Sequence, residues 1–324
     1  MLGFAAALVL ACVVLSLAVG SRSLPFGDAL RALFVSDGSE TAVIVRDLRL
    51  PRTVVALVVG SALGVAGAQL QGLTRNPLAE PGLLGVSAGA ALAVVATGTA
   101  LGVEGAQGQA WAALVGAIAA TLAVYLLGGA GRAGGGPLPL VLAGVAVTAL
   151  LSAMTTVLVL LDAETLNEYR FWAVGSVAGR DLGLLLAVVP LLTVGIVLAV
   201  VSARTLDLLA LGDDLARGLG ARVAWGRAGV ALSATLLTAG AVSVAGPLLF
   251  VGLVVPHLAR RMTGPVHGWL LPMSGLLGAA LLLAADVVGR VVARPGEIQV
   301  GIVTALIGGP FLVALVRGRR VSAP

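Results

Sequence analysis

Long uncharged apolar runs recur along nearly the whole sequence. A helix that crosses a bilayer needs about 20 mostly apolar residues, because the hydrocarbon core is about 30 Å thick and each residue rises about 1.5 Å. Hydrophobic residues make up 59% of the 324 residues and charged residues only 11%, so a soluble fold could not bury the apolar surface. The sequence therefore predicts an all-α polytopic membrane protein. The runs long enough to span are residues 2–19, 54–70, 83–103, 110–127, 138–161, 182–201, 269–288 and 300–316.

The stretch from residue 227 to residue 260 is too long for one span and short for two. Gly246 and Pro247 lie inside it, and proline breaks a helix because it lacks the N–H donor and its ring clashes with the preceding turn. We interpret the stretch as two helices, about 228–245 and 247–262. The prediction is then about ten transmembrane helices.

Residues 1–324 are expected to form a single transmembrane domain of a bacterial inner membrane. Ten helices that start in the cytoplasm return the C-terminus to the cytoplasm. The tail Arg317-Gly-Arg-Arg agrees with this orientation, since cytoplasmic flanks are enriched in basic residues. The other arginines are divided almost evenly between the two sides. The first run could instead be a signal peptide, but no basic side chain precedes it, which favours a retained helix.

The basic and sulfur-containing residues exclude several kinds of site. All 20 basic residues are arginines, so the chain lacks the lysine with which a P-loop reaches nucleotide phosphates. One cysteine, Cys12, cannot form an intrachain disulfide or a paired-cysteine metal site. His257 and His267 have no carboxylate or cysteine close in sequence to complete a zinc site. The chain has no basic cluster outside its short loops, so its charge does not point to a nucleic acid partner.

The spans contain few ionisable side chains. Asp286 lies near the end of its run and Glu104 just beyond another. Ion-coupled transporters and proton pumps place acids or histidines deep in the membrane, because these groups bind the ion or proton. An ion-coupled transporter is therefore a weaker hypothesis, and an intramembrane enzyme lacks a catalytic set of residues. A transporter of this composition is expected to take its energy from a partner.

The loop of residues 202–227 is long and contains leucines as well as polar residues. A short capped helix is expected from Thr205, and a second one follows, with Asp213 at its N-cap, Asp214 at the positive end of its dipole and Gly220 in a left-handed turn at its end. Exposed leucines on these helices could bind a partner protein. The alternative is an amphipathic pair that lies in the membrane interface.

Seven segments of the sequence carry a family resemblance, and they occur in the family's order over nearly the whole chain. They are Leu48-Arg-Leu-Pro-Arg, Gly67-Ala-Gln-Leu-Gln-Gly-Leu-Thr-Arg-Asn-Pro-Leu-Ala-Glu-Pro-Gly-Leu-Leu-Gly, Phe171-Trp-Ala-Val-Gly-Ser, residues 211–220, Phe250-Val-Gly-Leu-Val-Val-Pro-His-Leu-Ala-Arg-Arg, Ala285-Asp-Val-Val-Gly-Arg and Val300-Gly-Ile-Val-Thr-Ala-Leu-Ile-Gly-Gly-Pro-Phe. With them the chain resembles the iron-siderophore and vitamin B12 (FecCD-type) permeases. It departs from the family at Gln299, where the family usually has a proline.

The resemblance implies a type II, binding-protein-dependent ABC importer. In such importers two permease subunits, identical or paralogous, form a central pathway, two separate ATPase subunits bind ATP, and a periplasmic or lipoprotein binding protein delivers an iron-siderophore, haem or cobalamin-type substrate. The chain itself would be a transport subunit and not an enzyme, with no cofactor or metal of its own and with membrane lipid around it. By this resemblance the residues that couple to the ATPase are Leu211, Gly212, Asp213, Asp214, Arg217, Leu219 and Gly220.

Three arginines match family positions that face acidic residues of the binding protein: Arg49, Arg52 and Arg290. Arginine pairs with carboxylates through charge-assisted hydrogen bonds that fix geometry. The alternative is that these side chains extend to lipid head groups, as arginines at helix ends often do.

The fifth and tenth helices contribute to the pathway in this family. In the fifth run, Thr148, Ser152, Thr155 and Thr156 fall at helical spacing on one face. A weakly polar, uncharged stripe suits the passage of a bulky substrate. The alternative is that these hydroxyls bond to carbonyls of their own helix.

Overall fold

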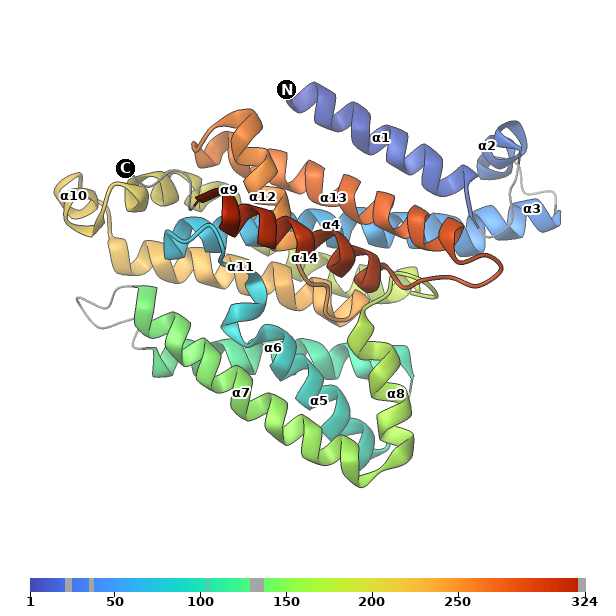
Figure 1. Cartoon of the computed structure of the whole chain (residues 1–324), viewed down its shortest axis with the longest axis horizontal. Helices are drawn as coiled ribbons and strands as arrows, with labels where there is room; N and C mark the ends of the chain where they lie inside the picture. Colours follow the sequence, from blue (N-terminus) through green and yellow to red (C-terminus); the bar gives the residue numbers. More distant parts are fainter. Residues whose placement is uncertain (21–24, 35–37, 104, 129–136, 320–324) are drawn as a thin grey trace.

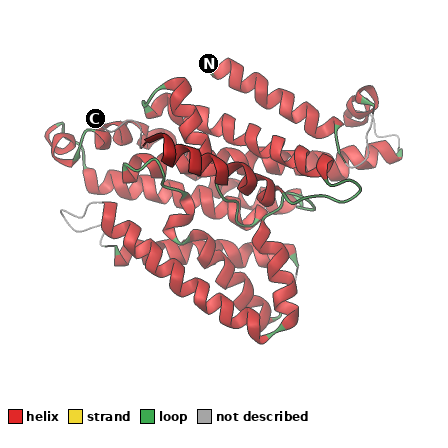
Figure 2. Cartoon of the chain, in the orientation of Figure 1, coloured by secondary structure: helices red, strands yellow, loops and turns green. Residues whose placement is uncertain are grey.

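The chain forms a bundle of helices (Figures 1 and 2). The computed structural model describes residues 1–20, 25–34, 38–103, 105–128 and 137–319, and every regular element within these ranges is a helix, which confirms the all-α prediction. In chain order the elements are α1 (Leu2–Ala18), α2 (Phe26–Phe34), α3 (Glu40–Val43), the π-helix η1 (Ile44–Arg49), α4 (Leu50–Thr74), the 3₁₀ turn η2 (Pro81–Leu84), α5 (Val86–Leu101), α6 (Ala106–Leu127), α7 (Pro137–Leu161), α8 (Ala163–Val174), α9 (Leu182–Ala210), α10 (Asp213–Gly218), α11 (Val223–Ala245), α12 (Val251–Thr263), α13 (His267–Val292) and α14 (Val300–Arg319).

Seven helical stretches of the described residues are long and apolar enough to cross a membrane. The apolar helices α1 and α5 are shorter, with 17 and 16 residues, and α12 has 13. The expected count of ten is therefore approximate. The break at Gly246 and Pro247 is confirmed, because α11 ends at Ala245 and the next helix begins at Val251. Glu104 and Arg320 lie outside the described residues.

The two largest differences from the predicted boundaries are both extensions of a helix. The span expected at 54–70 belongs to one continuous helical stretch, Glu40–Thr74. The helix continues through charged residues because partners inside the protein bind them. The span expected at 182–201 continues as α9 to Ala210, so there is no separate capped helix from Thr205. Buried Ala199, Leu206 and Leu209 keep the apolar face of α9 on the protein core, which offsets the polar residues between them.

Helix α4 lies at the centre of the bundle and packs on α13, α11, α12 and α9. Small residues allow this contact: a Cβ on Gly60 would overlap the backbone of Gly278, and one on Gly67 would overlap the backbone of Gly252. Inside a bilayer the hydrophobic effect does not drive helices together, so van der Waals contact between closely packed backbones supplies much of the attraction. The glycines of α4 therefore fix where its neighbours lie.

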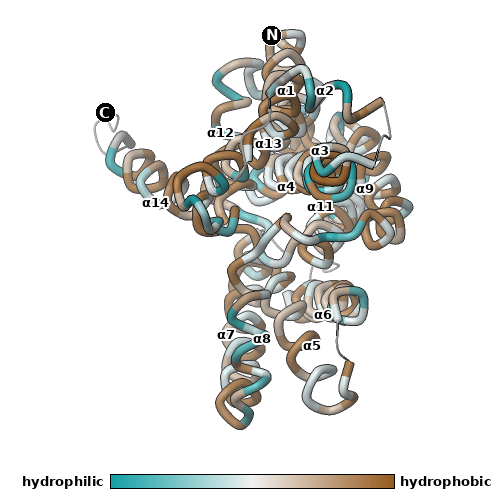
Figure 3. The backbone as a smooth tube through the Cα atoms, turned by 90° about the vertical axis from the view of Figure 1, so that its right-hand side faces the viewer, coloured by the Kyte–Doolittle hydropathy of each residue, from teal (hydrophilic) through white to brown (hydrophobic). Residues whose placement is uncertain are grey.

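Two parts of the chain stand out from this central group. Helices α5, α6, α7 and α8 pack on one another as a second group, which joins the first through α6 and α11 (Figure 3). Helix α14 packs on α12 and α13 and projects sideways from the bundle in the same view. Brown, apolar segments dominate the helices of both groups in Figure 3.

Candidate functional sites at the two ends of the bundle

Charged side chains gather at opposite ends of the long helices. One end, here the α10 end, comprises the end of α4, α10 and the start of α11; it lies on the left of Figure 1. The other, here the Arg52 end, comprises η1, the start of α4, and the ends of α1 and α13; it lies on the right. The predicted coupling residues lie at the first end and the predicted docking arginines at the second.

Helix α10 is a single short turn with well-defined ends. The N-cap is Gly212, whose positive φ of 105° suits glycine. The prediction that Asp213 is the N-cap was wrong, because Asp213 is the first residue of the helix. At its other end, the N–H of Gly220 bonds the carbonyl of Arg217 at 2.9 Å and the N–H of Ala221 bonds the carbonyl of Ala216 at 2.9 Å. This pair is a Schellman motif with Gly220, at φ 83°, in the left-handed position. The left-handed turn predicted at Gly220 is confirmed.

Asp213 ties α10 to two longer helices. It pairs with Arg75 at the end of α4, at 2.5 Å, and with Arg227 near the start of α11, at 2.8 Å. Neither arginine was among the residues predicted from sequence. The signal for Arg75 was its place in the Thr-Arg-Asn-Pro segment directly after a span, but nothing in the sequence indicates that Asp213 is its partner.

The remaining predicted coupling residues lie on the surface of α10. Asp214 and Arg217 form an exposed ion pair at 2.9 Å, one turn apart. Leu211 and Leu219 are more than half exposed, and so is Leu215, which the sequence did not single out. Exposed leucines around a short, anchored helix form a small apolar surface with a charged border.

A half-buried carboxylate follows Arg75 closely in the sequence. Glu80, in the segment between α4 and α5, accepts a hydrogen bond from the backbone N–H of Phe250. Burial raises the pKa of the Glu80 carboxyl, and the bond from Phe250 opposes that rise. Phe250 stands just before α12 with a positive φ of 68°, which is uncommon for a residue other than glycine. Sequence reasoning missed both residues.

Two further contacts join the start of α13 and the last turn of α12 to neighbouring helices. Asp207 of α9 accepts bonds from the backbone N–H of His267, at 2.9 Å, and binds its ring Nδ1 at 2.7 Å. Arg260 donates to the side-chain carbonyl of Gln71 at 3.3 Å. His267 therefore serves as an internal contact between helices.

At the Arg52 end, one buried carboxylate is shared by two arginines. Asp286 is 1% exposed and pairs with Arg52 at 2.7 Å and with Arg290 at 2.9 Å. Arg52 also pairs with Glu297, which precedes α14, at 2.6 Å. The cluster joins α4, α13 and the segment that leads to α14.

The structure brings the three predicted arginines together but places two of them in the interior. Arg49 is 5% exposed and donates to the carbonyls of Leu17 and Ala18 at 2.8 and 2.7 Å. Arg290 is 2% exposed and donates to the carbonyl and hydroxyl of Ser16 at 3.0 and 2.9 Å. Both satisfy groups at the C-terminal end of α1, where helix carbonyls lack partners of their own. Arg52 is the one of the three whose partner, Glu297, is partly exposed.

The four hydroxyl residues of α7 divide between two environments. Thr155 is buried and bonds the carbonyl of Leu151 at 2.8 Å, whereas Thr148 is half-buried. Ser152 and Thr156 are exposed, and the Thr156 hydroxyl bonds the carbonyl of Ser152 at 2.9 Å. Both threonine bonds are to the helix's own backbone, as the alternative reading expected.

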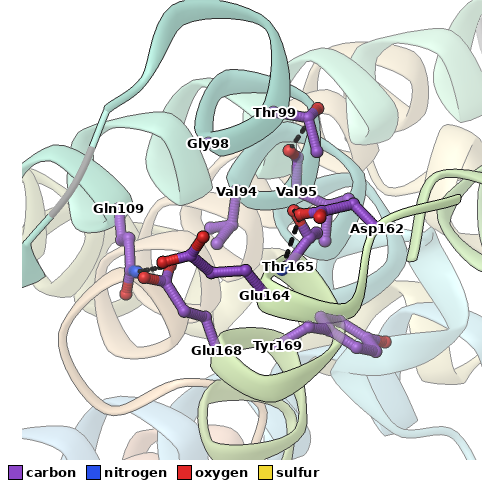
Figure 4. A pocket seen from close by; sticks show the side chains of 10 residues that line it. All are labelled: Val94, Val95, Gly98, Thr99, Gln109, Asp162, Glu164, Thr165, Glu168 and Tyr169. Carbon is purple, nitrogen blue, oxygen red and sulfur yellow. Dashed lines mark hydrogen bonds between the residues drawn. The ribbon is translucent and has the colours of Figure 1, made fainter. Parts of the chain in front are cut away.

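A polar pocket that the sequence did not predict lies between α5, α6 and α8 (Figure 4). Its water-accessible volume is about 170 Å³, and its polar lining includes Asp162, Glu164 and Glu168. Asp162 caps α8 through Thr165 at 2.8 Å, and the hydrogen bonds from Thr165 lower the pKa of this carboxyl. Gln109 donates to Glu168 at 3.3 Å. The bond from Gln109 joins α6 to α8, whereas the bonds of Asp162 fix the start of α8.

The model of the FecCD transport family matches residues 8–318. The chain belongs to this family. Among its FecCD-type relatives, the ferric enterobactin transport system permease protein FepD of Escherichia coli (strain K12) is 44% identical over 311 residues, which are 96% of this chain and 92% of that protein. The hemin transport system permease protein HmuU of Yersinia pestis is 38% identical over 327 residues, with 99% and 96% covered.

A solved structure supports the same assignment. An inward-facing conformation of a putative metal-chelate type ABC transporter superposes with a TM-score of 0.84 at 31% identity, covering 98% of both chains. The family match, the relatives and the apolar helices identify the chain as a multi-pass membrane permease, a transport subunit of an ABC importer.

Proposed function

We propose that this FecCD permease imports an iron chelate of the siderophore, citrate or haem class, using ATP that separate subunits bind and hydrolyse. The observation that carries the proposal is full-length similarity to permeases named for ferric enterobactin, Fe(3+) dicitrate and hemin. Two copies of the permease, or this chain and a paralogue, enclose the pathway between them. No step requires a cofactor of this chain.

The α10 end supports docking of the ATPase. Its exposed leucines offer apolar area, and the ion pair of Asp214 and Arg217 offers a polar border, which is the arrangement of many protein interfaces. The other predicted coupling residues position this surface. Gly212 and Gly220 fix the ends of α10, and Asp213 anchors the helix to α4 and α11. This end then faces the cytoplasm, as do both termini.

The Arg52 end supports docking of the substrate-binding protein. The Arg52 side chain is 11% exposed and pairs with the more exposed Glu297, so a carboxylate of the binding protein can approach this pair from outside. Arg49 and Arg290 contribute by holding the end of α1 against α13, and not by direct contact. The exposed hydroxyls of Ser152 and Thr156 on α7 are available to line the pathway between two permease copies.

Co-purification tests the energy source and the docking surface together. The tagged permease is expressed with its neighbouring genes, extracted in mild detergent and probed for a P-loop ATPase. We expect the ATPase to accompany the wild type and to be lost from the double variant Leu215→Ala, Leu219→Ala. Leu101→Ala, an exposed leucine on α5, is the matched control and should retain it. An ATPase that stays with the double variant contradicts the docking surface; its absence from the wild type contradicts the energy source.

Uptake measurements test the substrate class. Proteoliposomes containing the permease, the ATPase and the binding protein are given ⁵⁵Fe-labelled siderophore, citrate or haem. We expect ATP-dependent accumulation of one of these chelates and none of free ferric ion. Uptake that follows a proton or sodium gradient and ignores ATP would support an ion-coupled transporter instead.

A further inference from the structure

The segment between α4 and α5 spans the space between the α10 end and α12. It begins at Arg75, which pairs with Asp213 of α10, and it reaches Glu80, which binds the N–H of Phe250 just before α12. Only four residues separate these two contacts in the sequence. The segment therefore touches the proposed ATPase-docking helix at one end and a different membrane helix at the other.

Local bonds make this segment a compact unit. Arg75 takes a left-handed conformation at φ 53°, and the N–H of Asn76 bonds the carbonyl of Gln71 at 3.2 Å. The Asn76 side chain then accepts from the N–H of Leu78 at 3.0 Å, and its carbonyl accepts from the N–H of Ala79 at 3.0 Å. A turn with these bonds has little freedom to stretch, so a displacement of Arg75 is passed to Glu80.

Glu80 holds a backbone position that has few other means of support. The segment from Gly246 to Phe250 interrupts the helical hydrogen bonding between α11 and α12, and Phe250 has a positive φ. An N–H at a helix start has no partner within the helix, and here the Glu80 carboxylate supplies one. The carboxylate also lies at the positive end of the α12 dipole.

Phe250 in turn contacts α14. Its side chain lies where a Cβ of Gly308 would be, so the ring packs directly on the backbone of α14 at a position that only glycine allows. One further contact joins the same two helices, because the rings of His257 and Phe311 meet edge to face with centroids 5.6 Å apart. A shift of Phe250 therefore presses on α14.

We propose that residues 75–80 form a strut that transmits movement of α10 to α12 and α14, and that Glu80 is the positioning residue at its far end. The inference rests on the proposed function, since it needs an ATPase that moves α10. The ATPase shifts the permease between two arrangements only if it binds them with different affinity. The strut supplies such a difference, because it makes the position of α10, which the ATPase contacts, depend on the position of α14. The ion pair of Asp213 with Arg75 then has two roles: it holds α10 in place and it passes movement of α10 to the strut.

The test compares Glu80→Ala with Glu80→Gln in the complete importer. Glutamine keeps a carbonyl that accepts the Phe250 N–H, whereas alanine leaves that N–H without a partner. We measure co-purification of the ATPase, ATP hydrolysis and chelate imported per ATP in proteoliposomes. For Glu80→Ala we expect an intact complex that hydrolyses ATP but imports about five- to tenfold less chelate per ATP. Glu80→Gln should retain most of the coupling.

A second readout separates transmission from folding. Ile307 of α14 is exposed, so Ile307→Cys in a Cys12→Ala background reports the surroundings of α14 through its rate of thiol labelling. We expect ATP to change this rate in the parent and in Glu80→Gln but not in Glu80→Ala. The matched control is Glu164→Ala, an exposed acid on α8, which should behave as the parent.

Three results overturn the strut. Normal import per ATP in Glu80→Ala does so while the proposed function stands. Equal losses in the alanine and glutamine variants do so as well, because the hydrogen bond is then not the operative contact. A wild-type importer without any ATP-dependent import overturns the proposed function and the strut with it.

Discussion

Asp286 shows how a single side chain can hold three helices inside a membrane. It neutralises Arg52 and Arg290, and Arg290 in turn bonds the end of α1. Removing one partner of a buried ion pair is costly, because the charges left behind cannot return to water. The arginines at this end therefore stabilise the contacts among α1, α4 and α13.

Replacing Asp286 with leucine should therefore destabilise the protein strongly. We expect a loss of about 3–5 kcal/mol, since two buried guanidiniums lose their counter-charge. The measurement is the free energy of unfolding in mixed micelles. Asp214→Leu, which removes a fully exposed carboxylate, is the control and should leave stability almost unchanged. A loss for Asp286→Leu no larger than for this control would show that water or lipid head groups reach the arginines.

The environment of Glu80 should make the stability of the folded protein depend on pH. Burial raises the pKa of its carboxyl, so the native state disfavours the charged form, and stability falls as pH rises above about 4.3, the usual value for glutamate. Glu80→Gln removes this charge, so its melting temperature relative to wild type should increase between about pH 4 and pH 8. Asp162→Asn should show the opposite trend, because hydrogen bonds from Thr165 lower the pKa of Asp162. A Glu80→Gln difference in melting temperature that does not change with pH would contradict a half-buried environment that disfavours the charged carboxylate.

Among the elements, those governed by apolar periodicity and backbone chemistry were predictable from sequence. The break between α11 and α12 followed from Gly246 and Pro247, and the end of α10 followed from Gly220. The hydrogen-bond and ion-pair partners of the charged side chains were not predictable, because they depend on which helix ends meet in space. Arg49 and Arg290 look like surface arginines in sequence, yet each binds carbonyls of α1, more than thirty residues away for Arg49 and 274 for Arg290.

The close packing of α4 gives a prediction for a whole element. Gly60→Ala places a Cβ against the backbone of Gly278, and relieving this overlap requires α4 and α13 to separate. We expect a loss of about 1–3 kcal/mol in the free energy of unfolding. The control is Gly229→Ala in α11, where a Cβ meets nothing within 4 Å and the helix gains up to about 1 kcal/mol. Similar values for both variants would mean that α4 and α13 move apart freely.

At the scale of the whole molecule, one exposed apolar face of the permease suits contact with a second copy. Helix α14 projects from the bundle, and Ile302, Leu306, Val313 and Val316 are exposed on one face of it. These residues recur at helical spacing, with Gly309 between them, where a Cβ would meet nothing within 4 Å. A flat apolar face with a glycine at its centre suits close approach of another helix. We therefore expect a second permease copy to pack there.

Disulfide cross-linking in native membranes tests this arrangement. Cys12 is the single cysteine, so Cys12→Ala gives a clean background for Leu306→Cys. If α14 meets its counterpart in a two-fold dimer, a mild oxidant should convert much of this variant to a cross-linked pair, because the two sulfurs must come within bonding distance. Val197→Cys, on the exposed face of α9, is the matched control and should stay monomeric. Equal cross-linking at both positions would indicate random collision in the bilayer, and the exposed face of α14 would then be a lipid-facing surface.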